Sequence, residues 1–359
     1  MKKNGLVYVV LLMGILISAC QPQVVTETLV ETQIVEVEKE GALTIGYAAP
    51  GLMGGQASIQ SGLVDNAKVK GWAVVTTNAN GDPQKQLNDV EYMVSLPVDA
   101  VVAVPKDSAG ICTAVEKAQA AGIPFYTIDI GPVGCQVDMV VMSNNTMAGE
   151  QAGQALVDLL TEKYGEPQGK VLEITGDLAM NTAVLRRDGF HNVLDQYPNI
   201  EVIQKAGNWQ ADLGASIVED VAGANEDLDA IYMASDAVYF PGTIAALDQL
   251  GRLFPRGEEG HIFLAGVDAS PSGVQAIKDG WADACSSQPI PDFGIVVEWI
   301  EMKVLNGEDP SEGEVVQEGA LWSPAEIIFN AEGTPELFLA TTLVTEENMN
   351  DPALWANQQ

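Results

Sequence analysis

Short apolar runs alternate with longer segments of mixed polar and apolar residues along most of this chain. The runs are rich in β-branched residues and show little polar–apolar alternation, which is typical of strands buried on both faces. The segments between them are amphipathic and long enough to form helices. Because strand and helix follow one another regularly from residue 41 onward, the pattern predicts an α/β fold with doubly wound parallel sheets.

The expected strands form two series, one in each half of the chain. The first series comprises Leu43–Ala48, Trp72–Thr76, Ala100–Val104, Phe125–Ile128 and Met139–Met142. The second comprises Val171–Thr175, Val202–Lys205, Ala230–Ala234, Ile262–Val267 and Ala282–Cys285. Since a chain of 359 residues exceeds one ordinary hydrophobic core, two lobes are expected.

An internal repeat supports two similar lobes. In each copy a strand runs to a carboxylate, a glycine follows at the same distance, and the next strand ends in Asp. These landmarks are Asp107, Gly122 and Asp129 in the first copy, and Asp236, Gly251 and Asp268 in the second. Chance likeness between short α/β units is the alternative, but the common order of the landmarks favours a true repeat.

The N-terminal segment has the pattern of an export signal. Lys2 and Lys3 precede an apolar run over 6–17 that is too short to span a bilayer permanently. The run ends in Ile-Ser-Ala-Cys, which predicts a lipoprotein signal peptide over 1–19 and lipid attachment at Cys20; an ordinary signal peptide with a chance cysteine is the alternative. Residues 20–40 are expected to form an acidic tether, with a strand or a short coiled coil as the rival interpretation.

Charge and cysteine content exclude several classes of function. The chain has 17 basic and 50 acidic residues, so it repels nucleic acid and anionic lipid. With only His191 and His261, and no clustered cysteines, no metal site and no cofactor are expected. Cys112 and Cys135 are the expected pair if a disulfide forms outside the cytoplasm, which leaves Cys285 over.

Four carboxylates stand at the predicted carboxyl ends of strands, where ligands bind in open parallel sheets. They are Asp107, Asp129, Asp236 and Asp268. Capping of the following helix is the alternative role for each of them. A cleft role is favoured for Asp129 and Asp268, because carboxylates can accept hydrogen bonds from the hydroxyls of a sugar in fixed geometry.

Several stretches over about residues 41–345 carry a family likeness. They are GIPFYTIDI (122–130), SNNTMAGEQAG (143–153), NTAVLRRDGF (181–190), MASDAVYFPGTIAAL (233–247), FLAGVDASPSGVQAIKDG (263–280) and SSQPIPDFG (286–294). In their order and spacing the chain resembles the ribose/galactose-type periplasmic sugar-binding proteins of ABC importers, which have the type I binding-protein fold. The resemblance implies two doubly wound lobes joined by a three-strand hinge.

The resemblance also implies lobe boundaries. The N-terminal lobe would comprise 41–145 and 289–308, the C-terminal lobe 146–288 and 309–345, and residues 346–359 a C-terminal extension. Crossings between lobes are expected near Asn144–Thr146, Ser287–Pro289 and Gly307–Pro310.

The resemblance implies roles for the residues that stand at the family's binding positions. Arg186 would donate from its guanidinium to ligand oxygens, with a surface arginine beside Arg187 as the alternative. Asp129 and Asp268 would accept hydroxyls, and Gln288 would contact the ligand near a crossing. Trp209 would stack on the ligand, with plain core packing as its alternative.

The loop AAPGLMGGQ (48–56) departs from the family pattern because it has no aromatic residue, and Gln56 is expected to replace a lost polar contact there. Val104 or Pro105, and Ser235, stand where the family has asparagines. These departures leave the identity of the sugar open and also permit a deoxy sugar or a polyol.

The expected function is that of an extracytoplasmic, lipid-anchored, monomeric binding protein. It would deliver a sugar or polyol to an ABC permease and its ATPase by hinge closure. An enzyme is disfavoured because the chain has no G-x-S-x-G elbow, and 165–170 lacks the P-loop spacing. A transcription regulator would need a basic helix-turn-helix before residue 41. A nucleoside-binding lipoprotein or a ligand sensor of the same fold remains the alternative.

Overall fold

The computed structural model describes residues 33–35, 42–52 and 55–358. The chain divides into two units, Met1–Glu31 and Thr32–Gln359, and the account below concerns the second. The signal peptide expected over 1–19 and the lipidation site expected at Cys20 lie outside the described residues. Among the helices that the structure describes, none combines the length and the apolar character needed to cross a membrane.

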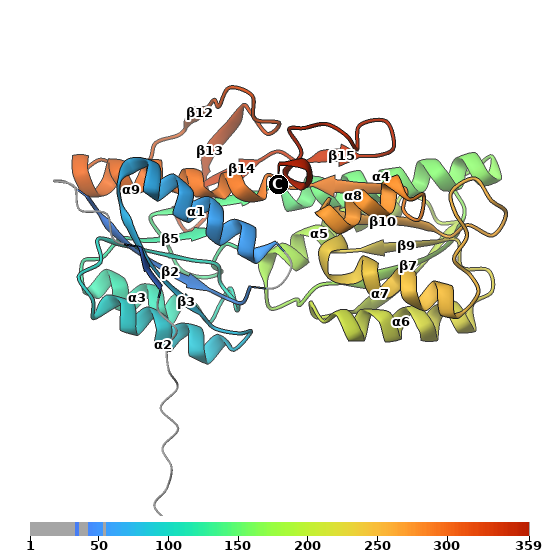
Figure 1. Cartoon of the computed structure of the whole chain (residues 1–359), viewed down its shortest axis with the longest axis horizontal. Coiled ribbons are helices and arrows are strands. Elements are labelled where there is room, and N and C mark those ends of the chain that lie inside the picture. Colours follow the sequence, from blue (N-terminus) through green and yellow to red (C-terminus); the bar gives the residue numbers. More distant parts are fainter. Residues whose placement is uncertain (1–32, 36–41, 53–54, 359) are drawn as a thin grey trace, which may run out of the picture. The chain divides into compact units, whose positions relative to one another are not determined.

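The first lobe is built on a parallel sheet with the strand order β3-β2-β4-β5-β6 (Figure 1). Its strands are β2 (Thr44–Ala49), β3 (Ala73–Asn78), β4 (Ala100–Ala103), β5 (Phe125–Ile128) and β6 (Met139–Ser143). Its helices are α1 (Gln56–Lys70), α2 (Pro83–Val94), α3 (Cys112–Ala120), η1 (Ile290–Val296), α9 (Val297–Glu301) and η2 (Met302–Asn306).

Both faces of this sheet are covered, as its apolar strands require. Tyr47 and Val102 join a core cluster that also holds side chains from α1, η1 and α9. Their neighbours Ala48 and Val101 face the opposite way, into a cluster formed with α2 and α3. Because both clusters exclude water, successive residues of β2 and β4 are apolar on both faces, which explains why the sequence shows apolar runs without alternation.

The second lobe repeats this plan with the strand order β8-β7-β9-β10-β11. Its strands are β7 (Gly169–Thr175), β8 (Ile200–Ala206), β9 (Ala230–Met233), β10 (Phe263–Asp268) and β11 (Ala284–Ser287). Its helices are α4 (Asn145–Tyr164), α5 (Asn181–Leu194), α6 (Ala211–Ala224), α7 (Asp236–Gln249) and α8 (Pro271–Lys278). Helices α4 and α5 cover one face of the sheet, and α6, α7 and α8 cover the other.

The predicted repeat corresponds to equivalent places in the two sheets. Strands β4 and β9 each lie beside the strand that opens their lobe, and β5 and β10 lie next to them. The matched carboxylates Asp129 and Asp268 end these last strands and share a positive φ, 64° and 110°. The α/β fold and its two lobes are therefore as predicted.

The C-terminal region differs from the predicted boundaries. Strands β12 (Gly313–Val315), β13 (Ala325–Phe329) and β14 (Pro335–Leu339) extend the first sheet, because β14 pairs in parallel with β6. Only β15 (Thr342–Val344) joins the second sheet, antiparallel to β11. The assignment of 309–345 to the C-terminal lobe therefore does not hold for these first three strands.

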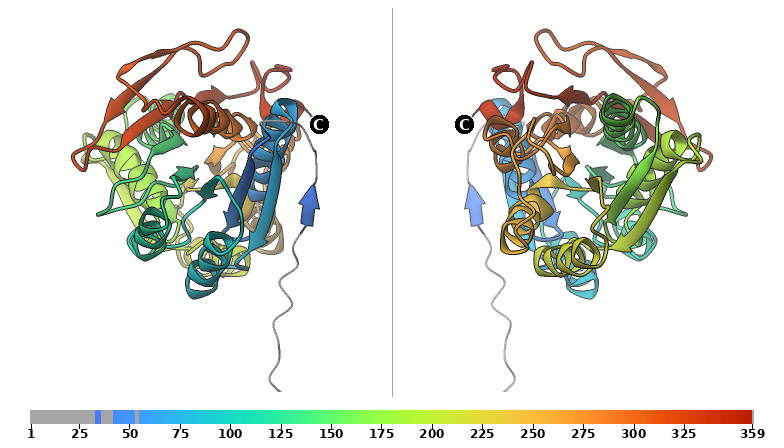
Figure 2. Two further views of the ribbon diagram at one scale, coloured as in Figure 1. Left: turned by 90° about the vertical axis from the view of Figure 1, so that its left-hand side faces the viewer. Right: turned by 90° about the vertical axis from the view of Figure 1, so that its right-hand side faces the viewer.

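The hinge follows from this topology. The chain passes from β6 to α4 and from β11 to η1 at the positions predicted for the first two crossings. The third passage lies between β14 and β15, after Leu339, rather than near Gly307–Pro310. Figure 2 shows the C-terminal segments, in red, together along one side of the lobes.

Residues Gln33–Val35 form the short strand β1, which pairs antiparallel with β3. The rival interpretation of an edge strand is thus correct for this part of the predicted 20–40 tether. The remainder of that segment lies outside the described residues.

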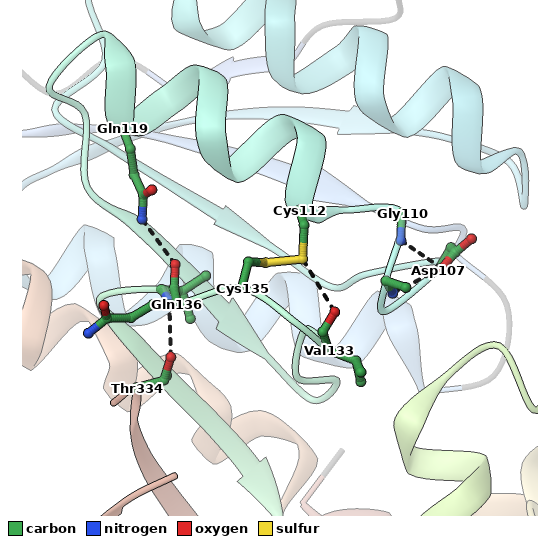
Figure 3. Close-up of a disulfide and its surroundings, with 10 residues drawn as sticks. Asp107, Gly110, Cys112, Gln119, Val133, Cys135, Gln136 and Thr334 are labelled. Atoms are coloured by element: carbon green, nitrogen blue, oxygen red, sulfur yellow. Dashed lines mark hydrogen bonds between the residues drawn. A yellow bond between two sulfur atoms is a disulfide. The ribbon is translucent and has the colours of Figure 1, made fainter. Parts of the chain in front are cut away.

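A disulfide joins Cys112 at the start of α3 to Cys135, as predicted (Figure 3). It holds the loop between β5 and β6 against the helix, and the same loop is tied to the C-terminal strands by Thr334, which accepts from the amide of Val137. Cys285 is a free, buried thiol.

Candidate functional site

A cavity of about 440 Å³ lies between the lobes, at the carboxyl ends of the parallel strands. The first lobe contributes the loops after β2, β3, β4 and β5 and the start of α1. The second lobe contributes the start of α5 and the loops after β8, β9 and β10, and the second hinge crossing closes one side. The polar side chains of the lining are Gln56, Asn78, Asn80, Lys106, Asp129, Thr182, Arg186, Ser235, Asp268 and Gln288.

Asp129 and Gln56 form the polar centre of the first lobe's wall. The Gln56 amide donates from Nε2 to Asp129 Oδ2 at 2.8 Å. Burial raises the pKa of the Asp129 carboxyl to about 6, although the Arg186 charge and the Gln56 hydrogen bond oppose this rise. Gln56 lies at the first position of α1, directly after the glycine-rich loop, so it occupies the place predicted for a substitute polar contact.

Arg186 forms the polar centre of the second lobe's wall. Its side chain is only 6% exposed. Its guanidinium donates from Nε to Asn145 Oδ1 at 2.8 Å, and from one Nη to the Ala234 carbonyl at 2.6 Å and to Asp268 Oδ1 at 3.2 Å. These contacts fix the guanidinium at the cleft and exclude the alternative of a surface arginine.

Close packing of two helices places Arg186 there. Gly149 on α4 and Gly189 on α5 face the other helix's backbone, and a Cβ on either would overlap it. The contact brings Asn145, at the start of α4, within reach of the Arg186 side chain. The glycine of the R-x-x-G-F element is therefore required for this helix contact.

The Asp268 carboxylate accepts hydrogen bonds from three segments of the chain. Besides Arg186, it accepts hydrogen bonds from the Ser235 hydroxyl and from the Gln288 amide. Burial raises the pKa of the Asp268 carboxyl, and the Arg186 charge is the main opposing influence. Ser235, which replaces a family asparagine, thus still supplies a polar contact at this place.

Trp209 lines the cleft beside the guanidinium. The Arg186 Cζ atom lies 5.7 Å from the centre of the indole ring, which places a cation against an aromatic face. The Trp209 indole donates from Nε1 to Met180 Sδ at 2.9 Å, and its backbone N–H donates to the Tyr239 hydroxyl at 2.9 Å. The ring is therefore held in a fixed orientation at the edge of the cavity.

Two predicted site residues are not brought to the cleft. Asp107 accepts from the backbone N–H groups of Ala109 and Gly110, at 3.0 and 2.8 Å, and lines a separate hollow near α2. Asp236 is fully buried behind the wall and accepts from the backbone and hydroxyl of Ser270. Asp107 makes local contacts of the capping kind named as its alternative role, whereas Asp236 contacts Ser270 at the start of α8 and leaves the capping of α7 to Ser235.

Asp236 nevertheless places a second carboxyl close to Asp268, behind the wall of the second lobe. Burial, and then the nearby charge of Asp268, raise the pKa of the Asp236 carboxyl to about 7. The pair forms because Ser235 and Asp236 open α7 beside the end of β10.

Sequence reasoning missed several residues of the site. Asn145 binds Arg186, and it is the asparagine that begins α4 in the crossover segment; only its place at the predicted hinge could have identified it. Lys106 and Met180 reach the cavity from loops that carry no motif. Their positions depend on how the two lobes meet, which local sequence does not specify.

Direct contacts join the lobes along one rim of the cleft. Lys106 of the first lobe pairs with Asp177 of the second at 3.1 Å. Ser108 donates its backbone N–H to the Ala179 carbonyl at 3.1 Å and accepts from the Asn181 N–H at 3.1 Å. Both walls of the cleft therefore face one common space in this conformation.

Curated proteins with similar sequences are binding proteins. The chain is 29% identical to the ribose import binding protein of Bacillus subtilis (strain 168) over 251 residues, which is 70% of this chain and 77% of that protein. It is 26% identical to the D-xylose-binding periplasmic protein of Escherichia coli (strain K12) over 271 residues, which is 74% of this chain and 78% of that protein.

Solved structures share the fold. A solute-binding protein of an ABC transporter from Mycobacterium smegmatis, with bound glycerol, superposes with a TM-score of 0.72 at 26% identity, covering 86% of this chain and 96% of that one. One from Bacillus halodurans, with bound myo-inositol, gives 0.72 at 21% identity and covers 88% and 99%. The second likeness shows the fold alone.

Residues 53–309, most of the described lobes, match the profile of the periplasmic binding protein domain. The two-lobed α/β architecture agrees with the type I fold of the solved neighbours. On the family match, and with a cleft built from the carboxyl ends of both sheets, this chain belongs to the periplasmic binding protein family.

Proposed function

We propose that this protein binds a neutral sugar or a related polyol between its lobes and delivers it to an ABC importer. The observation that carries the proposal is a single cavity lined by polar groups on both sides. Asp129 and Gln56 line it from the first lobe, and Arg186, Asp268 and Gln288 line it from the second lobe and the hinge. Polyhydroxyl ligands need both donors and acceptors, and burying a hydroxyl without a partner costs about 1–3 kcal/mol. A wall that combines a guanidinium, carboxylates and amides answers both needs.

The acceptors of the cleft support a ligand that brings hydroxyl hydrogens. Within the described part of the chain, Oε1 of Gln56 and Oε1 of Gln288 are buried and accept no hydrogen bond. Each amide already donates its N–H group to a carboxylate, Asp129 or Asp268, so its oxygen points elsewhere. A turn of either amide would present this oxygen to a hydroxyl hydrogen of the ligand, which an ionised carboxylate does not have.

The charge balance supports a neutral ligand. Among the described residues that line the cavity, the cations are Lys106 and Arg186, and each already faces a carboxylate. Asp129 lies on the opposite wall, and Asp236 is a further carboxyl behind Asp268 in the second lobe. An anionic ligand would therefore meet a net repulsive field in a poorly screened site.

Apolar side chains occupy the remaining lining. Ile59, Ile130 and Ile290 face the cavity from the first lobe and the hinge, and Trp209 faces it from the second. Sugars present C–H faces that bind aromatic and aliphatic surfaces. The isoleucines beside the polar groups of the first-lobe wall suit a ligand that presents a C–H surface, such as a deoxy sugar or a small polyol.

Hinge closure is the proposed mechanism. A ligand that contacts both walls stabilises the closed arrangement, because the ligand keeps its contacts with only one wall when the lobes open. The interlobe contacts around Lys106 and Ser108 are few and partly exposed, so they alone stabilise closure weakly. The closed protein would act as a monomer and dock on a membrane permease driven by a separate ATPase; the name of a relative, a ribose import binding protein, supports a role in import.

Ligand screening tests the function. A thermal-shift panel of pentoses, hexoses, polyols, sugar acids and nucleosides, followed by calorimetric titration of hits, should find a neutral sugar or polyol that raises the melting temperature by mass action. Hits confined to sugar acids or nucleosides would contradict the assignment. Turnover of a bound sugar would show an enzyme instead.

The lipid anchor is proposed from the sequence alone. Cleavage before Cys20 would leave a thiol able to carry diacylglycerol and would hold the protein at the outer face of the cell membrane or in the periplasm. Replacing Cys20 by serine should move the protein from the membrane fraction to the soluble fraction without changing ligand affinity. Unchanged membrane association would overturn the anchor.

A further inference from the structure

The backbone that carries Asp268 adopts an uncommon conformation. Asp268 has φ 110° and the next residue, Ala269, has φ 46°. Residues other than glycine rarely occupy this region, and they stay there only when their surroundings fix them. The turn separates β10 from α8 and directs the Asp268 carboxylate to Arg186 and Gln288.

The C-terminal extension supplies one of the groups that fix this turn. The indole N–H of Trp355 donates to the backbone carbonyl of Asp268 at 2.7 Å, in a buried position. The same carbonyl also accepts from the backbone N–H of Gln288 at 3.2 Å. The peptide after Asp268 is thus held by two donors that come from outside its own loop.

Trp355 is itself firmly held. It begins the short helix η3 (Trp355–Asn357), and its side chain belongs to the first lobe's core cluster beside Ile290 and Phe293. The preceding Leu354 is buried in a core cluster of the second lobe. Asn357 donates from its side chain to the carbonyls of Met349 and Asp351, which closes the extension on itself.

We propose that Trp355 is a positioning residue for the binding cleft. It does not line the cavity, but its indole N–H holds the Asp268 peptide so that the carboxylate can meet Arg186 and Gln288. Without this donor the turn can relax toward ordinary φ values, and the relaxation displaces the carboxylate. The C-terminal extension is therefore part of the ligand site without touching the ligand.

A matched pair of variants tests the inference. Trp355→Phe keeps an aromatic ring but removes the N–H. Trp322→Phe is the control, because Trp322 is also buried and its indole donates to Asp292 Oδ2 at 2.9 Å rather than to Asp268. The control also leaves a partly buried carboxyl without its donor, so its loss of stability should be at least as large.

We expect the two variants to lose similar stability but to differ in ligand affinity. Trp355→Phe should raise the Kd of the sugar found by screening about tenfold, whereas Trp322→Phe should change it less than about twofold, at a similar drop in melting temperature. Equal Kd values for the two variants would overturn the positioning role. This ligand measurement rests on the proposed function.

Amide hydrogen exchange of the ligand-free protein gives a readout that does not depend on the proposed function. Exchange in peptides covering 264–270 and 284–290 should be faster in Trp355→Phe than in Trp322→Phe. Unchanged exchange in both segments would overturn the inference whatever the ligand. If no sugar binds the wild-type protein but exchange responds as expected, the proposed function fails while the positioning role of Trp355 stands.

Discussion

Replacing Arg186 by methionine tests the central contact of the cleft. The guanidinium donates to Asn145, to the Ala234 carbonyl and to Asp268, and its side chain is 6% exposed. Removing one partner of a buried ion pair costs about 3–5 kcal/mol, because the remaining charge stays buried. We expect the free energy of unfolding at pH 8 to fall by about that amount.

The loss should depend on pH in a defined direction. Arg186 opposes the rise that burial imposes on the pKa of Asp268, so removing it raises that pKa further. A carboxyl with a raised pKa in the folded state destabilises the protein above that pKa and no longer does so once it is protonated. The difference between wild type and variant should therefore be largest at high pH and shrink as the pH falls.

Urea unfolding at several pH values and calorimetric titration with the sugar are the assays. Sugar affinity should fall by about tenfold to a hundredfold, as expected for the loss of one charge-assisted hydrogen bond. Arg187→Met is the matched control, since Arg187 lies next on the same helix and pairs with the exposed Asp188. This control should change neither quantity appreciably.

A double variant separates stability from binding. Adding Asp268→Asn to Arg186→Met removes the uncompensated charge, so stability should recover in part while affinity stays low. Wild-type affinity in the Arg186→Met protein would refute the assigned role. Failure of Asp268→Asn to restore any stability would refute the electrostatic reasoning.

Three further predictions follow from the site and its surroundings. Burial raises the pKa of Asp129 from 3.8 to about 6, so this carboxyl favours the folded state less as the pH rises through that range. Asp129→Asn should therefore stabilise the ligand-free protein at pH 8 but not at pH 4, as measured by urea unfolding. The same substitution should weaken sugar binding. Asp177→Asn removes the interlobe pair with Lys106 and should raise the Kd at most about fivefold, an effect that added salt should abolish; no dependence on salt would contradict the pairing. Replacing Cys112 and Cys135 together by serine should lower the free energy of unfolding by about 2–4 kcal/mol, and a reducing agent should do the same to the wild type but not to the variant.

Local pattern was sufficient to predict the repeated part of the fold. Each expected strand is present, with ends that shift by a few residues, because strands buried on both faces leave a continuous apolar run. The carboxylates that line the cleft were predictable for the same reason, since a parallel strand that ends in Asp presents that residue at the edge of the sheet where ligands bind in open α/β folds. Asp129 and Asp268 lie at that edge.

The same rule misplaced Asp107 and Asp236, and the reason lies in backbone direction. Asp129 and Asp268 have positive φ and line the cleft. Asp107 and Asp236 are not among the described residues with positive φ; Asp107 accepts from the nearby Ala109 N–H, and Asp236, the first residue of α7, accepts from Ser270 at the start of α8. The sequence alone does not specify φ at an aspartate.

Partners distant in sequence account for what the pattern could not predict. Strands β13 and β14 alternate more and less buried positions, but nothing in them specifies pairing with β6 rather than with the second sheet. The role of Trp355 was even harder to predict from the sequence, because an isolated tryptophan near the end of a chain is compatible with simple packing. Its distinguishing feature is an indole N–H directed at the carbonyl of a strained residue in the cleft. In this fold, therefore, the strands determine which side chains reach the cleft, whereas the C-terminal segment that binds behind them determines how accurately one of them is held.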